Sequence, residues 1–248
     1  MMNPLSLDET VMPTTTAINK QRVLNHLFTG LKKKIDAPEE PEPRPILEQL
    51  IYAICREGTT RDKADQAFRV LRERFFDWNE IRVSSVRELE EVLHDLPHAE
   101  SRAQRLVSLL QEVFETTFSF DLESLHKKGL KQAAKQLGRY EATNDHSVAW
   151  VIQHSLGGHA IPLDDANLRV VRRLGLVEEE LTDPETLRTS LEHLVPKARG
   201  PHFHELISFL AADACWKEPN CPSCPMCQEC PTGQENGRAE HGGRSKPR

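Results

Sequence analysis

The stretch CWKEPNCPSCPMCQEC, residues 215–230, holds five of the six cysteines in this 248-residue chain. Within it, two residues separate each neighbouring pair of the last four cysteines, and five residues separate the first two. Thiolates gathered at such spacing on a short loop are ligands for soft metals and metal clusters. Chance rarely places five of six cysteines within sixteen residues, so the stretch predicts a metal centre rather than a set of unrelated thiols.

Two metals compete for this loop. If Cys227 is left out, the spacing becomes C-x5-C-x2-C-x5-C, and four thiolates on a compact loop favour a [4Fe–4S] cluster. The predicted ligands are then Cys215, Cys221, Cys224 and Cys230. A zinc site usually joins two CxxC pairs that lie a dozen or more residues apart, and the pairs here are closer. We therefore predict an iron–sulfur cluster, with zinc as the alternative metal and Cys227 as a candidate substitute ligand.

Composition and charge narrow the class of protein. The chain is 38% hydrophobic and 28% charged, and no apolar run approaches the ~18 residues of a membrane span. The N-terminal residues lack the basic and apolar regions of a secretory signal, so we expect an intracellular, cytoplasmic protein with reduced thiols and no membrane partner. The net charge of −6 argues against an extensive nucleic-acid surface but is compatible with a local basic patch.

Hydrophobic periodicity predicts an all-α protein. Residues 102–118 place a stripe of leucine, valine and phenylalanine side chains on one helical face, and convincing alternation with period two is missing. Further helices are predicted at about 46–56, 61–75, 85–94, 121–136, 146–156, 165–174, 184–194 and 201–215.

The same pattern divides the chain into segments. The predicted segments are a disordered N-terminus (1–16), a helix with an acidic, Pro-rich linker (17–45), a helical domain (46–214), the cysteine loop (215–230) and a disordered tail (231–248).

Two stretches resemble a known family. The cysteine loop resembles the C-x6-C-x2-C-x5-C motif that closes endonuclease III-like helix-hairpin-helix DNA glycosylases, although it is one residue shorter and carries an extra thiol. HAIPLDDANLRVVRRLGL, residues 159–176, is similar to the family's apolar residue, aspartate and following helix. The resemblance covers residues 46–230. It implies a two-lobed helix-hairpin-helix glycosylase fold with a central lobe at about 58–160, a monomer, and duplex DNA with a damaged base as partner.

Asp164 is the main catalytic candidate. From the residues alone, it can N-cap a helix that begins at Asp165 and ends at Gly175. The resemblance places the family's catalytic aspartate at this position. There its carboxylate would stabilise the positively charged sugar as the base leaves, or activate the attacking nucleophile. The alternative is a helix cap without a chemical role.

The hairpin for which the family is named departs from its pattern. In YEATNDHSVA, residues 140–149, Ala142 and Asn144 stand where the family motif L-P-G-[VI]-G-x-K-[ST]-A has glycines. Asn144 could still adopt a left-handed conformation and contact DNA, whereas Ala142 would not do so cheaply. His146 stands at the position of the lysine that forms a Schiff base in bifunctional members, so the lyase step is predicted to be absent. The alternative for His146 is a surface residue near a helix start.

Four further residues match DNA-contacting positions of the family. Glu57 falls at the glutamine of the motif S-x-Q-[AN]-T-[DS], and Thr59 falls at its threonine. In LPHAESRA, residues 96–103, His98 occupies the wedge position and Arg102 replaces a lysine. The alternative is that both stretches are ordinary turns between helices.

Three functions follow from these observations. The first is a monofunctional glycosylase that hydrolyses the bond between a damaged base and its sugar. The second is a non-catalytic relative that keeps the fold and the cluster and binds DNA or protein. The third is a helical interaction module held together by zinc.

Overall fold

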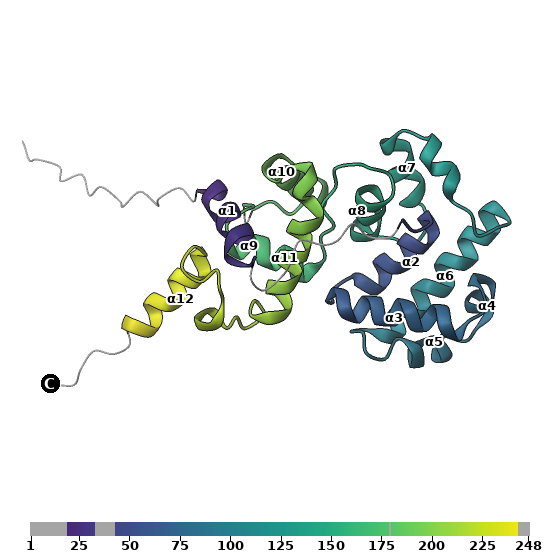
Figure 1. The fold of residues 1–248 in the computed structure, drawn as a ribbon, viewed down its shortest axis with the longest axis horizontal. Coiled ribbons are helices and arrows are strands. Elements are labelled where there is room, and N and C mark those ends of the chain that lie inside the picture. Colours follow the sequence, from purple (N-terminus) through teal and green to yellow (C-terminus); the bar gives the residue numbers. More distant parts are fainter. Residues whose placement is uncertain (1–18, 33–42, 179, 243–248) are drawn as a thin grey trace, which may run out of the picture.

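The computed structural model describes residues 19–32, 43–178 and 180–242, with side chains up to residue 237. All regular structure within these ranges is helical, which confirms the all-α prediction, and the helices form two lobes (Figure 1). The predicted disordered N-terminus and most of the predicted linker lie outside the described residues.

The first lobe contains the helices from α2 to α8. They are α2 (Ile46–Arg56), α3 (Arg61–Arg74), α4 (Trp78–Val83), α5 (Val86–Val92), α6 (Ala99–Thr117), the 3-10 turn η1 (Glu123–Lys127), α7 (Leu130–Leu137) and α8 (Asp145–His154). Helix α2 is central to this lobe because it packs against α3, α6 and α8. All of its eleven residues except Glu48 are buried. The lobe therefore begins at Ile46 rather than at about residue 58 as predicted.

The second lobe combines the N-terminal helix with the C-terminal helices. Its elements are α1 (Lys20–Gly30), α9 (Asp165–Arg173), α10 (Pro184–Leu194), η2 (Lys197–Arg199), α11 (Gly200–Asp213), η3 (Cys221–Ser223) and α12 (Pro231–Gly242). Helices α1 and α9 both pack against α11. Leu27 of α1 and Phe203 of α11 are fully buried in one apolar cluster with Val171 of α9, so residues far apart in the sequence build this core.

Local sequence signals explain three differences from the predicted helices. The helix expected at 121–136 is split into η1 and α7, because Gly129 takes an extended conformation before α7 begins. The short helix α4 was not predicted, and Asp77 caps it by accepting a hydrogen bond from the backbone N–H of Glu80. The predicted disordered tail is helical as far as residue 242, and α12 begins at Pro231, a favourable first helical residue.

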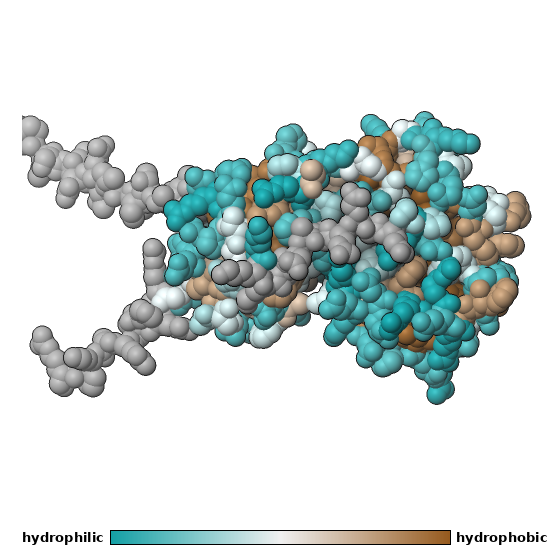
Figure 2. Space-filling model, viewed as in Figure 1, coloured by the Kyte–Doolittle hydropathy of each residue, from teal (hydrophilic) through white to brown (hydrophobic). Residues whose placement is uncertain are grey.

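The visible face of the molecule is mostly hydrophilic (Figure 2). Apolar residues gather on this face over the end of the first lobe that carries α4 and the C-terminal part of α6. Among the described helices, none combines the length and hydrophobicity that a membrane-crossing segment needs.

Candidate functional site

A cleft of about 780 Å³ is formed by residues from both lobes. The first lobe contributes the loop after α2, the start of α6 and the loop before α8, and the second contributes the N-terminus of α9. Six of the residues singled out from the sequence line it, namely Glu57, His98, Arg102, Asn144, His146 and Asp164. The seventh, Thr59, lines an adjacent smaller pocket that also includes Asp164. The fold thus gathers residues that are distant in the sequence.

Asp164 caps α9, as the sequence predicts. One carboxylate oxygen, Oδ1, accepts a hydrogen bond of 2.8 Å from the backbone N–H of Asn167. The other, Oδ2, accepts a hydrogen bond of 2.8 Å from the backbone N–H of Gly58 in the first lobe. The carboxylate therefore sits at the positive end of the helix dipole and is oriented by both lobes. Gly175, with φ +68°, follows the helix in the left-handed conformation that favours glycine.

A buried polar chain lies behind Asp164. The side-chain amide of Asn167 lies 3.3 Å from Asp164 Oδ2 and 3.2 Å from His204 Nε2. The side-chain oxygen Oδ1 of Asn167 accepts a hydrogen bond of 3.3 Å from the Ser208 hydroxyl. Burial, followed by the charge of Arg56, lowers the pKa of His204 well below its usual value, so the neutral ring can accept from the amide. Apart from its position in the first turn of α9, nothing in the sequence indicates this role of Asn167.

His146 is a buried residue of the cleft. It is only 2% exposed, so the alternative of a surface residue is wrong, and the reason is that α8 packs against α2. Neither ring nitrogen has a hydrogen-bond partner. Burial has the largest influence on the pKa of His146 and lowers it, while the negative charges of Asp164 and Glu57 act to raise it. The imidazole therefore lies close to two carboxylates without being hydrogen-bonded to either.

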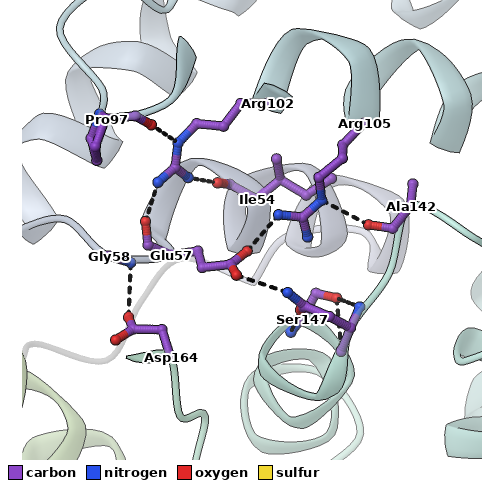
Figure 3. A network of polar contacts seen from close by, with 10 residues as sticks. Ile54, Glu57, Gly58, Pro97, Arg102, Arg105, Ala142, Ser147 and Asp164 are labelled. Carbon is purple, nitrogen blue, oxygen red and sulfur yellow. Dashed lines mark hydrogen bonds and ion pairs between the residues drawn. The ribbon is translucent and has the colours of Figure 1, made fainter. Parts of the chain in front are cut away.

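Glu57 is held by residues from two other elements (Figure 3). Its Oε2 forms a 2.6 Å ion pair with Nη1 of Arg105 in α6, and its Oε1 accepts a 2.8 Å hydrogen bond from the Asn144 side chain. Nε of Arg105 also donates to the Ala142 carbonyl at 3.0 Å. Burial alone would raise the pKa of Glu57, but His146, Arg105 and Asn144 together lower it. Arg105, which the sequence motifs do not single out, connects the loop after α2 with the loop before α8.

The Arg102 side chain is hydrogen-bonded to backbone carbonyl groups inside the protein. Its guanidinium donates to the carbonyl oxygens of Pro97, Ile54 and Glu57 (Figure 3), and the residue is 5% exposed. It thereby fastens the start of α6 to the C-terminal end of α2. The predicted contact of Arg102 with DNA stays a prediction.

The segment that replaces the family hairpin has an ordinary backbone. Asn144 has φ −140° and caps α8 in a reciprocal pair of hydrogen bonds with Ser147, so it does not adopt the left-handed conformation that the sequence allowed. Ala142 is buried. His98, by contrast, is exposed at the start of α6 with φ +57°, which is uncommon for a residue other than glycine. Among the predicted DNA contacts, His98 is the one whose backbone is in this left-handed conformation.

The clustered cysteines surround a second, much smaller cavity. All five line a cavity of about 20 Å³, and the six cysteines, all in the described part of the chain, form no disulfide. Arg173 Nη1 lies 3.5 Å from Cys215 Sγ, and the Asn236 side chain lies 3.3 Å from Cys221 Sγ. Such N–H donors suit thiolates that ligate a metal cluster.

The clustered thiols do not converge on a single point. Among the described residues, no group of three or more histidine, cysteine or acidic side chains converges on a single-ion site. A zinc ion with Zn–S bonds of about 2.3 Å needs such convergence, whereas an iron–sulfur cube holds its cysteines further apart. Burial raises the pKa of the Cys230 thiol to about 11.

Helix α9 links the cysteine loop to the cleft. Nε of Arg169 donates to the Cys215 carbonyl at 2.9 Å, and Arg173 donates to the carbonyls of Trp216 and Lys217 at 2.5 and 2.7 Å. These bonds hold the loop so that Lys217 lines the same cleft as Asp164. One helix therefore positions both the candidate catalytic carboxylate and the loop after α11.

Comparison with protein-family models and with curated proteins found no match. Several solved structures are similar. A non-covalent endonuclease III–DNA complex has a TM-score of 0.67 and 20% identity, covering 89% of this chain and 99% of that one. A trapped endonuclease III–DNA covalent intermediate has a TM-score of 0.65 and 20% identity, covering 89% and 100%. A thermostable thymine-DNA glycosylase has a TM-score of 0.60 and 20% identity, covering 87% and 97%. The chain has the helix-hairpin-helix DNA glycosylase fold.

Proposed function

We propose that this protein is a DNA glycosylase of base-excision repair, which hydrolyses the N-glycosidic bond of a damaged base flipped out of duplex DNA. The observation that carries the proposal is the Asp164 carboxylate, which the backbone N–H groups of Gly58 and Asn167 hold in a cleft between two lobes. The likeness to DNA-bound endonuclease III over 89% of the chain supports it.

Asp164 would supply electrostatic stabilisation in this reaction. As the base leaves, positive charge develops on the sugar, and a fixed carboxylate beside it lowers the energy of that transition state. The two N–H groups prevent the carboxylate from turning away, so little reorganisation is needed when the charge appears.

We further propose that the enzyme is monofunctional. Among the described residues that line the cleft, the one lysine is Lys217, an exposed side chain on the loop after α11. The buried position close to Asp164 holds the imidazole of His146, which cannot form a Schiff base. The product would then be an intact strand with an abasic site.

The proposed cofactor is a [4Fe–4S] cluster. The ligands would be Cys215, Cys221, Cys224 and Cys230. When bound, the cluster would cross-link the loop after α11 to the start of α12. The described part of the chain has no disulfide that could do this. The enzyme would work as an intracellular monomer.

The experiment is a base-release assay on duplex oligonucleotides that carry oxidised, alkylated, deaminated or mismatched bases. The protein is purified anaerobically, and heat and alkali reveal abasic sites. We expect release by the native protein and none by Asp164→Asn, whose binding to a duplex with a tetrahydrofuran abasic analogue persists. Strand cleavage without alkali, or a borohydride-trapped protein–DNA adduct, would contradict the monofunctional proposal, and Lys217→Ala would then test the lysine that lines the cleft.

A second candidate function is a non-catalytic DNA- or protein-binding relative. The network around Glu57 favours it, because a carboxylate held by Arg105 and Asn144 is not free to enter a DNA base stack. The net charge of −6 favours it as well. Binding to duplex DNA without base release on any of the substrates would support this function and reject the enzyme.

A further inference from the structure

His146 combines three properties that are rarely found together. It is 2% exposed, it lines the cleft, and both of its ring nitrogens are without a hydrogen-bond partner among the described residues. Buried polar side chains are nearly always hydrogen-bonded, because an unpaired one loses its hydration without compensation. The missing partner must therefore come from the cleft, either as water or as part of the bound molecule.

The surroundings of His146 favour a role in proton transfer. Its ring lies 6.0 Å from that of His204 and 6.1 Å from that of Trp150, measured between centroids, so two large side chains fix its orientation. Of the charged groups near it, the carboxylate of Asp164 favours its protonated form most. A neutral imidazole placed near a carboxylate can take up a proton and have the resulting charge stabilised.

We propose that His146 is a second catalytic residue, the general base that takes a proton from the water that attacks the sugar. This inference rests on the proposed glycosylase function and assigns its proton acceptor. Asp164 is then left to stabilise the sugar rather than to deprotonate the water.

The bond between the base nitrogen and C1′ of the sugar breaks, and its electron pair leaves with the base. The water oxygen forms a new bond to C1′, and one water proton moves to a ring nitrogen of His146. The imidazolium then returns that proton to the departed base, so that one water is consumed and the neutral imidazole is restored.

The charges around His146 determine the expected pH dependence. Burial lowers the pKa of His146 below its ordinary value of about 6.5, so the ring is neutral at pH 7. The charged and titratable groups near it come from α2 and the loop after it, α6, α8, α9 and α11, and they include Arg56, Glu57, Arg105, His154, Asp164 and His204. Because the general base must be neutral, the rate of base release falls as pH drops through the pKa of His146.

The experiment measures single-turnover base release from the lesion duplex on which the native protein is active. We expect His146→Gln to lower the rate about 100-fold or more and to abolish the acid limb of the pH profile. Its affinity for the duplex with the tetrahydrofuran analogue should stay unchanged. His146→Gly should regain part of the rate when imidazole is added, which a purely structural role would not allow.

A neighbouring histidine provides the matched control. His154 stacks on Trp150 with ring centroids 4.2 Å apart, and burial lowers its pKa to about 4, but it does not line the cleft. His154→Gln should keep the rate and the acid limb. If both His146 variants fail to fold, the temperature dependence of the acid limb of the native protein tests the proposal. The pKa of an imidazole shifts with temperature far more than that of a carboxyl group.

The outcomes separate this inference from the proposed function. An active native protein, an inactive Asp164→Asn variant and an unchanged rate and profile for His146→Gln would overturn the role of His146 alone. An acid limb of the native protein that does not shift with temperature would also overturn the role of His146. If the native protein releases no base from any substrate, the proposed function and this inference both fail.

Discussion

Gly58 contributes one N–H group to the cleft, and its backbone conformation determines where that group points. Its φ of +64° lies in the left-handed region, and its N–H donates to Asp164 Oδ2 at 2.8 Å. A side chain at this position would have room, because the nearest atom to an added Cβ is a nitrogen of Arg102 at 4.0 Å. The requirement for glycine is therefore conformational, not one of space.

We predict that Gly58→Ala destabilises the fold by about 1 kcal/mol through backbone strain and also lowers base release by turning the N–H away from Asp164. Gly157→Ala is the matched control, because Gly157 has φ +62° and no atom near its added Cβ. Chemical denaturation and single-turnover assays measure the two effects. Equal loss of activity in both variants would show that strain, and not the contact with Asp164, is responsible.

Cys227 packs closely against the start of α12. Its thiol lies 3.7 Å from the carbonyl oxygen of Gly233, and a Cβ added to Gly233 would lie 2.5 Å from the Cys227 carbonyl oxygen. This close backbone packing joins the cysteine loop to the start of α12.

We therefore predict that Cys227→Ser keeps its iron, whereas Cys221→Ser loses it. Iron analysis and the visible absorbance of anaerobically purified protein measure this. Loss of iron from Cys227→Ser together with retention in Cys215→Ser would show that Cys227 replaces Cys215 as a ligand.

At the scale of the elements, the ion pair between Glu57 and Arg105 joins three segments of the first lobe. The Glu57 side chain is 23% exposed, so solvent screens the pair only partly. Because Asn144 caps α8 and also donates to Glu57, the start of α8 is tied to the end of α2. The network therefore ties the loop after α2, the start of α6 and the loop before α8 together at this edge of the cleft.

The lowered pKa of Glu57 makes this network sensitive to acid. A carboxyl whose pKa is lower in the folded than in the unfolded state, where it is about 4.3, stabilises the fold above that value and loses the contribution as pH falls through the folded pKa. We predict that Glu57→Gln lowers the free energy of unfolding at pH 7, and that the difference from native protein shrinks below about pH 4.

Urea denaturation at pH 7 and at a pH below about 4 measures the free energy of unfolding of both proteins. Glu73→Gln is the control, because Glu73 forms an exposed pair with Arg69. A difference for Glu57→Gln that persists undiminished in acid would mean that lost packing, not lost charge, explains its effect.

For the whole molecule, the distribution of charge limits how DNA can bind. The chain carries a net charge of −6, and Arg102, Arg105 and Arg173 donate to groups within the protein. Lys217 lines the cleft with an exposed side chain. Few phosphate contacts should therefore form, and the dependence of affinity on salt should be shallow.

We predict that Lys217→Ala reduces the slope of log affinity against log salt concentration by about 0.9 for duplex DNA, which corresponds to one phosphate contact. Lys131→Ala, an exposed lysine of α7 outside the cleft, should leave the slope unchanged. Fluorescence anisotropy with a tetrahydrofuran-containing duplex at several salt concentrations measures both slopes. An unchanged slope for Lys217→Ala would place the phosphate contacts elsewhere.

The sequence by itself determined the features that depend on neighbouring residues. Helical periodicity established the all-α class, the N-cap at Asp164 follows from one aspartate before an apolar helical pattern, and the cysteine spacing predicted a metal loop. The prediction of a disordered tail was wrong because α12 is polar and lacks the apolar stripe by which a helix is recognised in a sequence.

The tertiary structure alone decided which of these residues meet. Glu57 contacts a residue 48 positions away in α6 and another 87 positions away before α8, and Gly58 contacts Asp164 at a separation of 106. Periodicity and spacing carry no information about such pairs, because they arise from how helices pack and not from the local preference of the chain. The burial of His146 and the closed network around Glu57 are therefore properties of the fold, although the residues that make them are visible in the sequence.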